Sequence, residues 1–258
     1  MSGAPASQDV AIRIRGLCKS FGSQQVLRGV DLDVQHGQVT VVIGLSGAGK
    51  SVLLKLILGL LRPDAGSVEI DGRDILTLGP GSMRRLRRHF GMVFQHGALF
   101  DSMTLFENVA FPLREHEKLP EAELQRRVEA ALDDVGLAGH GHKLSAQLSG
   151  GMRKRASLAR ALVRNPRFLL YDEPTTGLDP IRTASIDRLI SDTSARHPEI
   201  SSLVISHDMT ATFRIADRVA MLYEGRIITE GTPEELHACP DARVQQFITG
   251  NLDGPIST

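Results

Sequence analysis

Apolar residues follow strand-like and helix-like periods in different parts of the chain. Residues 11–17 (AIRIRGL) and 26–34 (VLRGVDLDV) alternate apolar and polar positions, which predicts strands with one buried face. Residues 39–43 (VTVVI) are almost all apolar, as expected for a strand buried on both faces. Further strands are predicted in the same way at 91–94, 168–171 and 203–206, and a hairpin over 219–230. Helical patterns separate the buried runs, so a parallel sheet covered by helices is the simplest topology.

A helix-rich segment with no convincing strand occupies the middle of the chain, from about 96 to 164. Thr104 and Glu107 have the spacing of a capping box, and Pro112 is expected to bend or end the helix that they start. A second helix is predicted over 120–136, because apolar residues recur there at one-turn and two-turn intervals. These apolar residues are Leu124, Val128, Ala131, Leu132 and Val135. We therefore expect a helical subdomain of about 96–164, inserted between strands of the sheet.

The composition and charge balance are typical of a soluble protein. The 258 residues are 41% hydrophobic and 23% charged, which is enough for a domain with a sizeable core. Thirty Lys and Arg balance thirty Asp and Glu, and this zero net charge argues against an extended nucleic-acid interface. The basic runs at 84–88 and 153–155 are therefore interpreted as solvated helix faces, not as sites for nucleic acid or lipid headgroups.

Cysteine usage and hydropathy favour a cytosolic protein. Cys18 and Cys239 lie far apart and are expected to be reduced thiols. The first ten residues lack the basic and apolar segments of a signal peptide. The longest apolar run, 52–61, is too short to cross a bilayer and contains Lys55, so it predicts a buried helix. If the protein works at a membrane, another chain must supply the membrane-spanning part.

A complete phosphate-loop pattern, G-x-x-x-x-G-K-[ST], directly follows the buried strand 39–43 and leads into an apolar helix. Its residues are Gly44, Leu45, Ser46, Gly47, Ala48, Gly49, Lys50 and Ser51. The glycines let backbone N–H groups face a polyphosphate, and the helix N-terminus adds the positive end of its dipole. Lys50 is predicted to contact the β- and γ-phosphates, and the Ser51 hydroxyl to bind Mg²⁺. By itself this loop predicts only that a nucleoside triphosphate binds.

Two acidic residues end the buried strand 168–171, at the edge of the sheet where open α/β sheets bind ligands. Asp172 is placed there to hold Mg²⁺ or a water molecule bound to it. Glu173 follows directly and is a candidate general base that polarises an attacking water. An isolated acidic pair at a strand end is usually just solvated, but the phosphate loop upstream favours the catalytic interpretation.

Several other motifs occur in the order known from the ATP-binding subunit of ABC transporters, which the chain resembles over nearly its whole length, 9–252. The matching segments are LSGGM (148–152, the signature), VFQ ending at Gln95 (the Q-loop), EPTTGLDP (173–180, the D-loop), ISHD with His207 (the switch histidine) and Phe21 (the residue that stacks on adenine). The resemblance implies an α/β fold with a P-loop NTPase (RecA-like) core and a mostly parallel sheet. It also implies an N-terminal antiparallel β subdomain and the inserted helical subdomain as parts of a single ATP-binding domain.

Subunits of this family dimerise head to tail, and each ATP lies between one phosphate loop and the partner's signature. The resemblance therefore assigns three residues to the γ-phosphate of the neighbour's ATP: Ser149, Gly150 and Gly151. It implies that Gln95 senses the γ-phosphate, Mg²⁺ and the attacking water, and links to a membrane partner. His207 is expected to hold the transition state of hydrolysis, and Asp179 to act across the dimer interface.

Two positions depart from the common pattern of the family. Leu45 stands where many members have proline, and its side chain is expected to point away from the phosphates. Met152 replaces the usual glutamine of the signature, and LSGGM before a basic helix resembles the ATPases of MCE-domain lipid transporters, such as the Mla-type phospholipid system. The segment 240–258 resembles the tail of the Mla-type ATPase and is a candidate dimer contact. Composition alone predicts a short helix there, followed by a frayed end.

The resemblance implies an ATP- and Mg²⁺-dependent ATPase that powers phospholipid movement between inner and outer membranes through a separate permease. The partners that it implies are a second ATPase subunit, the permease, an MCE-domain lipid-binding protein and a small STAS-domain subunit, without nucleic acid. The location that it implies is the cytoplasmic face of the bacterial inner membrane. Residues 96–103 (HGALFDSM) are expected to form the groove that receives the permease.

Other functions are compatible with parts of this pattern. One alternative is a transporter for another solute, such as an amino acid or an organic solvent. Another is a soluble ABC protein that acts on ribosomes or DNA, although such proteins typically carry two cassettes or a long inserted coiled coil. A P-loop kinase or GTPase would leave the signature unexplained.

Overall fold

The computed structural model describes residues 10–95 and 97–256, and its strands form two sheets. The larger sheet has the order β10-β9-β3-β8-β7-β6 and is parallel except for β10. Its strands are β3 (Val39–Ile43), β6 (Phe90–Val93), β7 (Phe168–Asp172), β8 (Ser201–Ser206), β9 (Arg218–Tyr223) and β10 (Arg226–Gly231). The smaller sheet is antiparallel, in the order β2-β1-β4-β5. Its strands are β1 (Val10–Phe21), β2 (Gln24–Gln35), β4 (Ala65–Ile70) and β5 (Arg73–Asp74).

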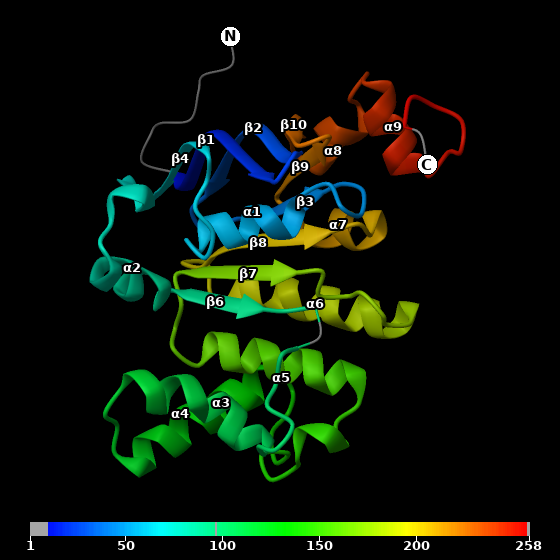
Figure 1. The fold of residues 1–258 in the computed structure, drawn as a ribbon. Coiled ribbons are helices and arrows are strands. Elements are labelled where there is room, and N and C mark those ends of the chain that lie inside the picture. The colour runs from blue at the N-terminus through cyan, green and yellow to red at the C-terminus, as the bar shows by residue number, and fades with distance from the viewer. Residues whose placement is uncertain (1–9, 96, 257–258) are drawn as a thin grey trace.

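Helix α1 (Lys50–Ile57) lies between the two sheets, as Figure 1 shows. Val42 of β3 belongs to the apolar cluster that α1 forms with the antiparallel sheet. Val41 and Ile43 point to the opposite face and join a second cluster formed with the remaining helices. Both faces of β3 are thus covered, which explains why 39–43 needs an unbroken apolar run.

Three helices below the large sheet in Figure 1 form the expected helical subdomain: α3 (Leu105–His116), α4 (Glu121–Asp134) and α5 (Gly150–Leu162). The capping box is confirmed, because Glu107 N donates to Thr104 Oγ1 at 3.2 Å and Thr104 N donates to Glu107 Oε2 at 2.7 Å. Of the two outcomes expected at Pro112, a bend or an end, the end does not occur, because the helix continues to His116. Burial of Val109 and Leu113 on either side of the proline compensates for the hydrogen bond that it cannot donate.

The predicted apolar face of α4 is confirmed, and all five of its residues are buried. Helix α5 packs closely on β6, where a Cβ on Gly91 would lie 2.8 Å from the carbonyl oxygen of Ala161. The other helices are α2 (Pro80–Arg87), α6 (Pro180–Arg196), α7 (Met209–Ile215), α8 (Pro233–His237) and α9 (Ala242–Thr249). Short 3₁₀ turns occur at Ile75–Thr77 and Ser145–Gln147. No helix of the described residues is long and apolar enough to cross a membrane.

Two details differ from the sequence expectations, and one agrees with them. The apolar run 52–61 is helical only to Ile57, because the chain turns at Gly59, where φ is +61°, and leaves Leu60 exposed. Of the two basic runs, 84–88 lies on α2, which has no buried residue, and is solvated as predicted. The interpretation of 153–155 is wrong in part, because the Lys154 side chain is buried with an exposed fraction of 7%.

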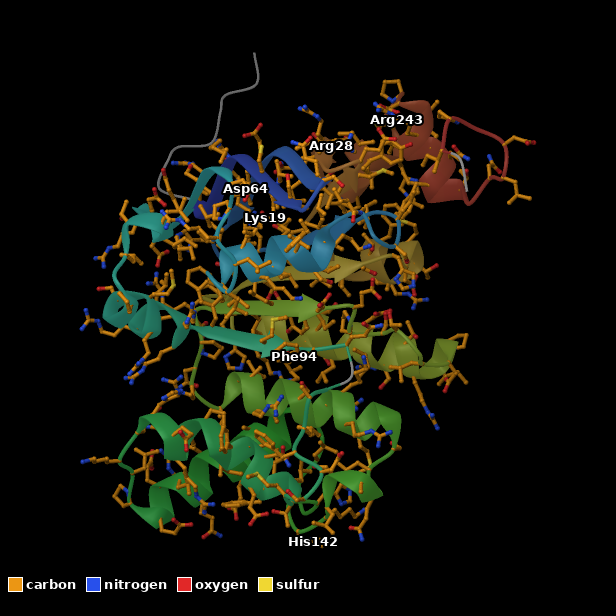
Figure 2. The ribbon with its side chains drawn as sticks, in the orientation of Figure 1. Lys19, Arg28, Asp64, Phe94, His142 and Arg243 are labelled. Atoms are coloured by element: carbon orange, nitrogen blue, oxygen red, sulfur yellow. The ribbon has the colours of Figure 1, made fainter. Side chains whose placement is uncertain are left out.

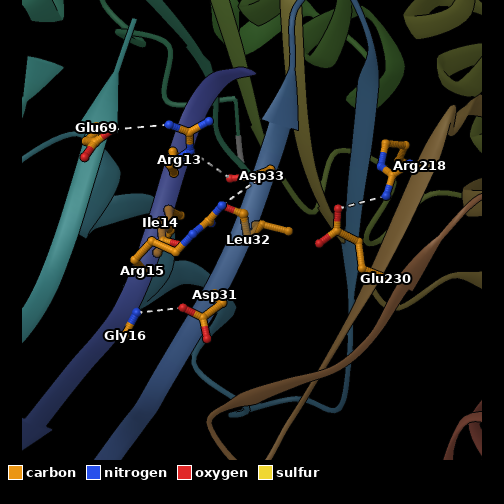
Figure 3. A network of polar contacts seen from close by, with 10 residues as sticks. All are labelled: Arg13, Ile14, Arg15, Gly16, Asp31, Leu32, Asp33, Glu69, Arg218 and Glu230. Carbon is orange, nitrogen blue, oxygen red and sulfur yellow. Dashed lines mark hydrogen bonds and ion pairs between the residues drawn. The ribbon is translucent and has the colours of Figure 1, made fainter. Parts of the chain in front are cut away.

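A row of charged residues crosses the antiparallel sheet and stabilises its solvent-facing side (Figure 3). Arg13 on β1 lies 3.8 Å from Asp33 on β2 and 3.7 Å from Glu69 on β4. Arg15 pairs with the same Asp33 at 2.7 Å. These opposite charges sit in register on adjacent strands, and such cross-strand pairs each contribute about 0.2–1 kcal/mol.

The C-terminal segment forms the predicted short helix α9, and the chain then turns back on that helix. The buried amide of Gln246 accepts from Ile256 N at 2.7 Å and donates to Ile256 O at 3.1 Å. The expected frayed end is therefore wrong for residues 250–256, although Leu252 at the tip of the turn is 90% exposed. Residues 257 and 258 lie outside the described part of the chain.

Candidate functional site

The phosphate loop (Gly44–Ser51) connects the end of β3 to the start of α1. Two of its glycines have a backbone conformation or surroundings that do not tolerate a side chain. A Cβ on Gly44, where φ is +152°, would lie 2.2 Å from the carbonyl oxygen of Leu222. Gly49 has a φ of +103° and caps α1 without a side chain. The first N–H groups of α1 are therefore free of any capping side chain and can bind an anion. Leu45, Ser46 and Gly47 of this loop are exposed.

The Lys50 side chain is buried inside this loop. Its ammonium donates to the carbonyl oxygens of Gly44 at 2.8 Å and Leu45 at 3.0 Å, and lies 3.9 Å from Glu173 Oε1. Burial lowers the pKa of Lys50, while the charges of Glu173 and Asp172 oppose that shift. The loop thus holds a cation in place by interactions that phosphate oxygens are able to replace.

Ser51 and Asp172 meet across the edge of the sheet. Ser51 Oγ donates to Asp172 Oδ1 at 3.0 Å. Burial raises the pKa of Asp172, an effect that the hydrogen bond from Ser51 partly offsets. A hydroxyl and a half-buried carboxylate are oxygen ligands of the kind that Mg²⁺ prefers, with phosphate and water oxygens completing the shell. No cluster of three His, Cys, Asp or Glu able to hold a metal occurs in residues 10–95 and 97–256, so these two residues alone do not form a closed protein cage.

Glu173 follows Asp172 in a left-handed conformation, with φ at +48°, which is costly for a residue other than glycine. Its N–H donates to the carbonyl oxygen of Ile205 on β8 at 3.0 Å, and this bond holds the turn. Its Oε2 accepts from Thr176 Oγ1 at 3.0 Å and lies 3.4 Å from His207 Nδ1. The carboxylate is thus oriented by two side chains, of which Thr176 was not among the predicted site residues.

The strand order explains why these residues meet. β8 lies between β3 and β7, and Ile43 is opposite Ser206 while Asp172 is opposite Ile205. The carboxyl ends of the three parallel strands therefore share one edge, which is where open α/β sheets bind ligands. The residues that converge there are Lys50, Ser51, Asp172, Glu173 and His207.

The signature residues lie at the beginning of α5. Ser149 is the N-cap of this helix, and its Oγ accepts from Met152 N at 3.3 Å. No hydrogen bond within the described residues joins Ser149, Gly150 or Gly151 to the phosphate loop. The N-terminus of α5 carries no acidic residue in its first turn and so keeps its positive dipole end available.

The remaining predicted residues lie apart from the converging group. Asp179 is the N-cap of α6, where its Oδ1 accepts from Arg182 N at 3.0 Å. Phe21, at the end of β1, is 47% exposed, and the Lys19 ammonium lies 5.6 Å from its ring centroid. Figure 2 shows Lys19 on the antiparallel sheet, above the large sheet.

Gln95 follows Phe94, which lies beyond the end of β6 and is labelled in Figure 2 between the large sheet and the helical subdomain. Its carbonyl oxygen accepts a hydrogen bond from the buried ammonium of Lys154 on α5. Burial lowers the pKa of Lys154, and the charge of Glu173 acts in the opposite direction. Lys154 thus holds the main chain of Gln95 at α5, although the sequence predicts a solvated position for this lysine.

The sequence pattern of the ABC transporter family matches residues 27–176, which include the phosphate loop, the signature and Glu173. The chain belongs to the ABC transporter family. It is 45% identical to the probable ribonucleotide transport ATP-binding protein mkl of Mycobacterium leprae, over 96% of this chain and 71% of that protein. It is 40% identical to the intermembrane phospholipid transport system ATP-binding protein MlaF of Haemophilus influenzae, over 95% of this chain and 92% of that protein.

A solved structure of an ATP-binding cassette, a dimer in a post-hydrolysis state with ADP and Pi, has a TM-score of 0.77 to this fold. Its sequence is 28% identical, and the similarity covers 86% of this chain and 98% of the other. The predicted fold class is confirmed, and the chain is an ABC-type ATPase subunit with a nucleotide-binding domain.

Proposed function

We propose that this ATPase energises phospholipid transport between two membranes through a separate permease. The observation that carries the catalytic part is the convergence of Lys50, Ser51, Asp172, Glu173 and His207 at one edge of three neighbouring strands. This group contains a cation for phosphate, oxygen ligands for a divalent cation, and a carboxylate paired with an imidazole. These are the parts that phosphoryl transfer to water needs.

Each of these residues has a distinct role in the proposal. Lys50 exchanges its two loop carbonyls for oxygens of the β- and γ-phosphates of ATP. Glu173 accepts the proton of the water that attacks the γ-phosphate, and His207 donates a hydrogen bond to that phosphate. Ser51, Asp172 and Gln95 would hold Mg²⁺, which when bound neutralises charge on the phosphates.

The signature completes the site of the partner subunit in this proposal. Ser149, Gly150 and Gly151 form no hydrogen bond to their own phosphate loop within the described residues, and the N-terminus of α5 is suited to an anion. Asp179 acts across the same interface, and the exposed ring of Phe21 stacks on adenine. A dimeric cassette among the similar structures supports this arrangement.

Glu173→Gln tests the catalytic assignment. The variant is expected to bind ATP but to lose turnover by about a hundredfold or more, and to accumulate an ATP-bound dimer on size exclusion. Asp192→Asn, an exposed acid on α6, is the control. Hydrolysis at the normal rate by Glu173→Gln would remove this residue as the base.

Mixed dimers test the shared site. A Ser149→Arg protomer combined with a Lys50→Ala protomer should retain one intact composite site, and each variant alone should retain none. Normal hydrolysis by either variant alone would refute sharing.

The transported substrate is proposed from the relatives. The match to MlaF covers nearly all of both chains, and the Met152 signature agrees with that assignment. The higher identity to a protein named for ribonucleotide transport favours a different solute as the second candidate. Purification of the tagged complex, followed by identification of its subunits and lipids, separates the two. We expect an MCE-domain protein, a STAS-domain subunit and phospholipid; a solute-type permease without an MCE protein would overturn the lipid assignment.

A cleft of about 440 Å³ is the proposed binding site for the permease. It is lined by Gln95, Ala98, Leu99 and Asp101, by the start of α5, and by residues 176–178. Phe100, beside the cleft, has a half-exposed ring that packs 4.9 Å from Phe111. In this proposal the subunit lies on the cytoplasmic face of the inner membrane, and the segment 240–256 contacts the neighbouring ATPase. Leu99→Asp is expected to release the ATPase from the purified complex without changing the hydrolysis rate of the free subunit.

A further inference from the structure

The main chain just after β6 is fastened to helix α5 by two cationic side chains. Lys154 donates to the carbonyl oxygen of Gln95. Arg160, further along the same helix, donates through Nη2 to Gly97 O at 3.0 Å and through Nη1 to Ala98 O at 2.7 Å. The carbonyls of Gln95, Gly97 and Ala98 are therefore all held by one helix.

The burial of Lys154 indicates that its hydrogen bond to the Gln95 carbonyl has a role other than core packing. Its side chain is 7% exposed, and an ammonium that leaves water must be compensated by hydrogen bonds or by opposite charge. Among the described residues it forms no ion pair, and the Gln95 carbonyl is its hydrogen-bond acceptor. Glu173 adds a favourable field at longer range. An uncharged side chain would fill the same position without the cost of desolvation.

The same helix carries the signature at its first turn. Ser149 caps α5 through Met152 N, and Arg153 N donates to Ser149 O at 2.9 Å. Lys154 lies five positions after Ser149, a rise of about 7.5 Å along the helix axis. A helical turn is stiff, so the Gln95 carbonyl is held at a nearly fixed distance from the signature.

We propose that Lys154 and Arg160 are positioning residues that fix the main chain of Gln95, Gly97 and Ala98 to α5, so that Gln95 and the signature shift as one unit. Gln95 serves the nucleotide site of its own protomer, and Ser149–Gly151 serve the site of the partner. A displacement of Gln95 at one nucleotide site is therefore transmitted through α5 to the signature at the other nucleotide site. The inference rests on the shared site proposed above.

Hydrogen exchange of the nucleotide-free chain tests the attachment without hydrolysis. Lys154→Met or Arg160→Met should accelerate exchange in residues 97–101 by about tenfold, with little change in the body of α5. Lys154→Arg should restore protection, because the neighbouring cleft has room for the larger cation. Arg126→Met removes an exposed cation of α4 that pairs with Glu123, and should change nothing. If neither Lys154→Met nor Arg160→Met changed the exchange rate of residues 97–101, the proposal would be overturned.

Mixed dimers test the transmission. In the test dimer one protomer is intact and the other carries Lys50→Ala, so a single site hydrolyses ATP. Lys154→Met placed in either protomer should lower kcat by about tenfold and leave KM for ATP within about twofold. In the intact protomer it displaces Gln95 of the active site; in the other it displaces the signature of that site.

The outcomes separate the two proposals. An effect only from the intact protomer would show that Lys154 acts within its own site, and would overturn the coupling. Ser149→Arg in the Lys50→Ala protomer is the reference for sharing. If that variant leaves turnover unchanged, the shared site itself fails, whatever Lys154 does.

Discussion

Asn108 on α3 forms buried hydrogen bonds with the chain around Phe100, and their contribution to stability can be measured. Its side chain is fully buried, and Oδ1 accepts from Phe100 N at 2.8 Å. Nδ2 donates to Thr104 O and to Ser145 Oγ, both at 3.0 Å. One amide thus satisfies polar groups of a turn, a helix cap and a distant serine.

Asn108→Ala removes the acceptor of the Phe100 N–H and the donor to the buried Ser145 hydroxyl. Each buried polar group left without a partner costs about 1–3 kcal/mol, and the space of the lost amide adds to this cost. We expect a loss of about 3–5 kcal/mol in the free energy of unfolding, measured by urea unfolding with circular dichroism at constant pH and salt.

Gln125→Ala on the exposed face of α4 is the matched control, since it removes an amide that donates to Glu129 at 2.8 Å in solvent. It should change the free energy of unfolding by less than about 0.5 kcal/mol. If Asn108→Ala cost no more than this control, water would be replacing the lost hydrogen bonds, and the reasoning would be refuted.

Three further predictions concern the tail and the phosphate loop. Gln246→Leu removes both hydrogen bonds to Ile256, so limited proteolysis beyond α9 should become about tenfold faster; an unchanged rate would contradict this. Hydrogen bonds from Arg243 lower the pKa of Asp241 to about 2, so the stability that it contributes is present above its ordinary pKa of 3.8 and is lost as the pH falls toward 2. An NMR titration of the carboxyl should show this midpoint, which should rise in Arg243→Gln. Gly44→Ala should abolish ATP binding in calorimetry, because its Cβ would meet a carbonyl oxygen at 2.2 Å, and tight binding would refute the geometry.

The buried strands of the large sheet are predictable because covering both faces of a strand demands an unbroken apolar run. β3 satisfies this condition, and its bounds are the predicted 39–43. β4 and β5 were not predicted. The first half of β4 reads Ala-Gly-Ser, which carries no alternation, and the strand is fixed by pairing with β1, where Ile14 lies opposite Val68. Such pairing depends on residues far away in the sequence.

The site was predictable to the extent that its residues end parallel strands. Lys50, Asp172 and His207 follow strands that share an edge, so their order along the chain indicates that they meet. Lys154 could not be assigned, because its burial depends on a segment 59 residues earlier that crosses α5. For Thr176 the sequence shows only a hydroxyl three residues after Glu173. Its hydrogen bond to Glu173 depends on the turn at Glu173, which the sequence does not reveal.

The position of β3 in the sheet has a consequence for how the protein is made. β3 leaves the ribosome early, yet its two neighbours are β8 and β9, from the last quarter of the chain. At about 5–20 residues per second, this strand waits on the order of ten seconds or more for its partners. During that time its apolar residues depend on α1 and on the antiparallel sheet, which are complete much sooner. A nascent chain stalled before β8 would carry the whole phosphate loop without the sheet that holds it open, so nucleotide binding should appear only near the end of synthesis.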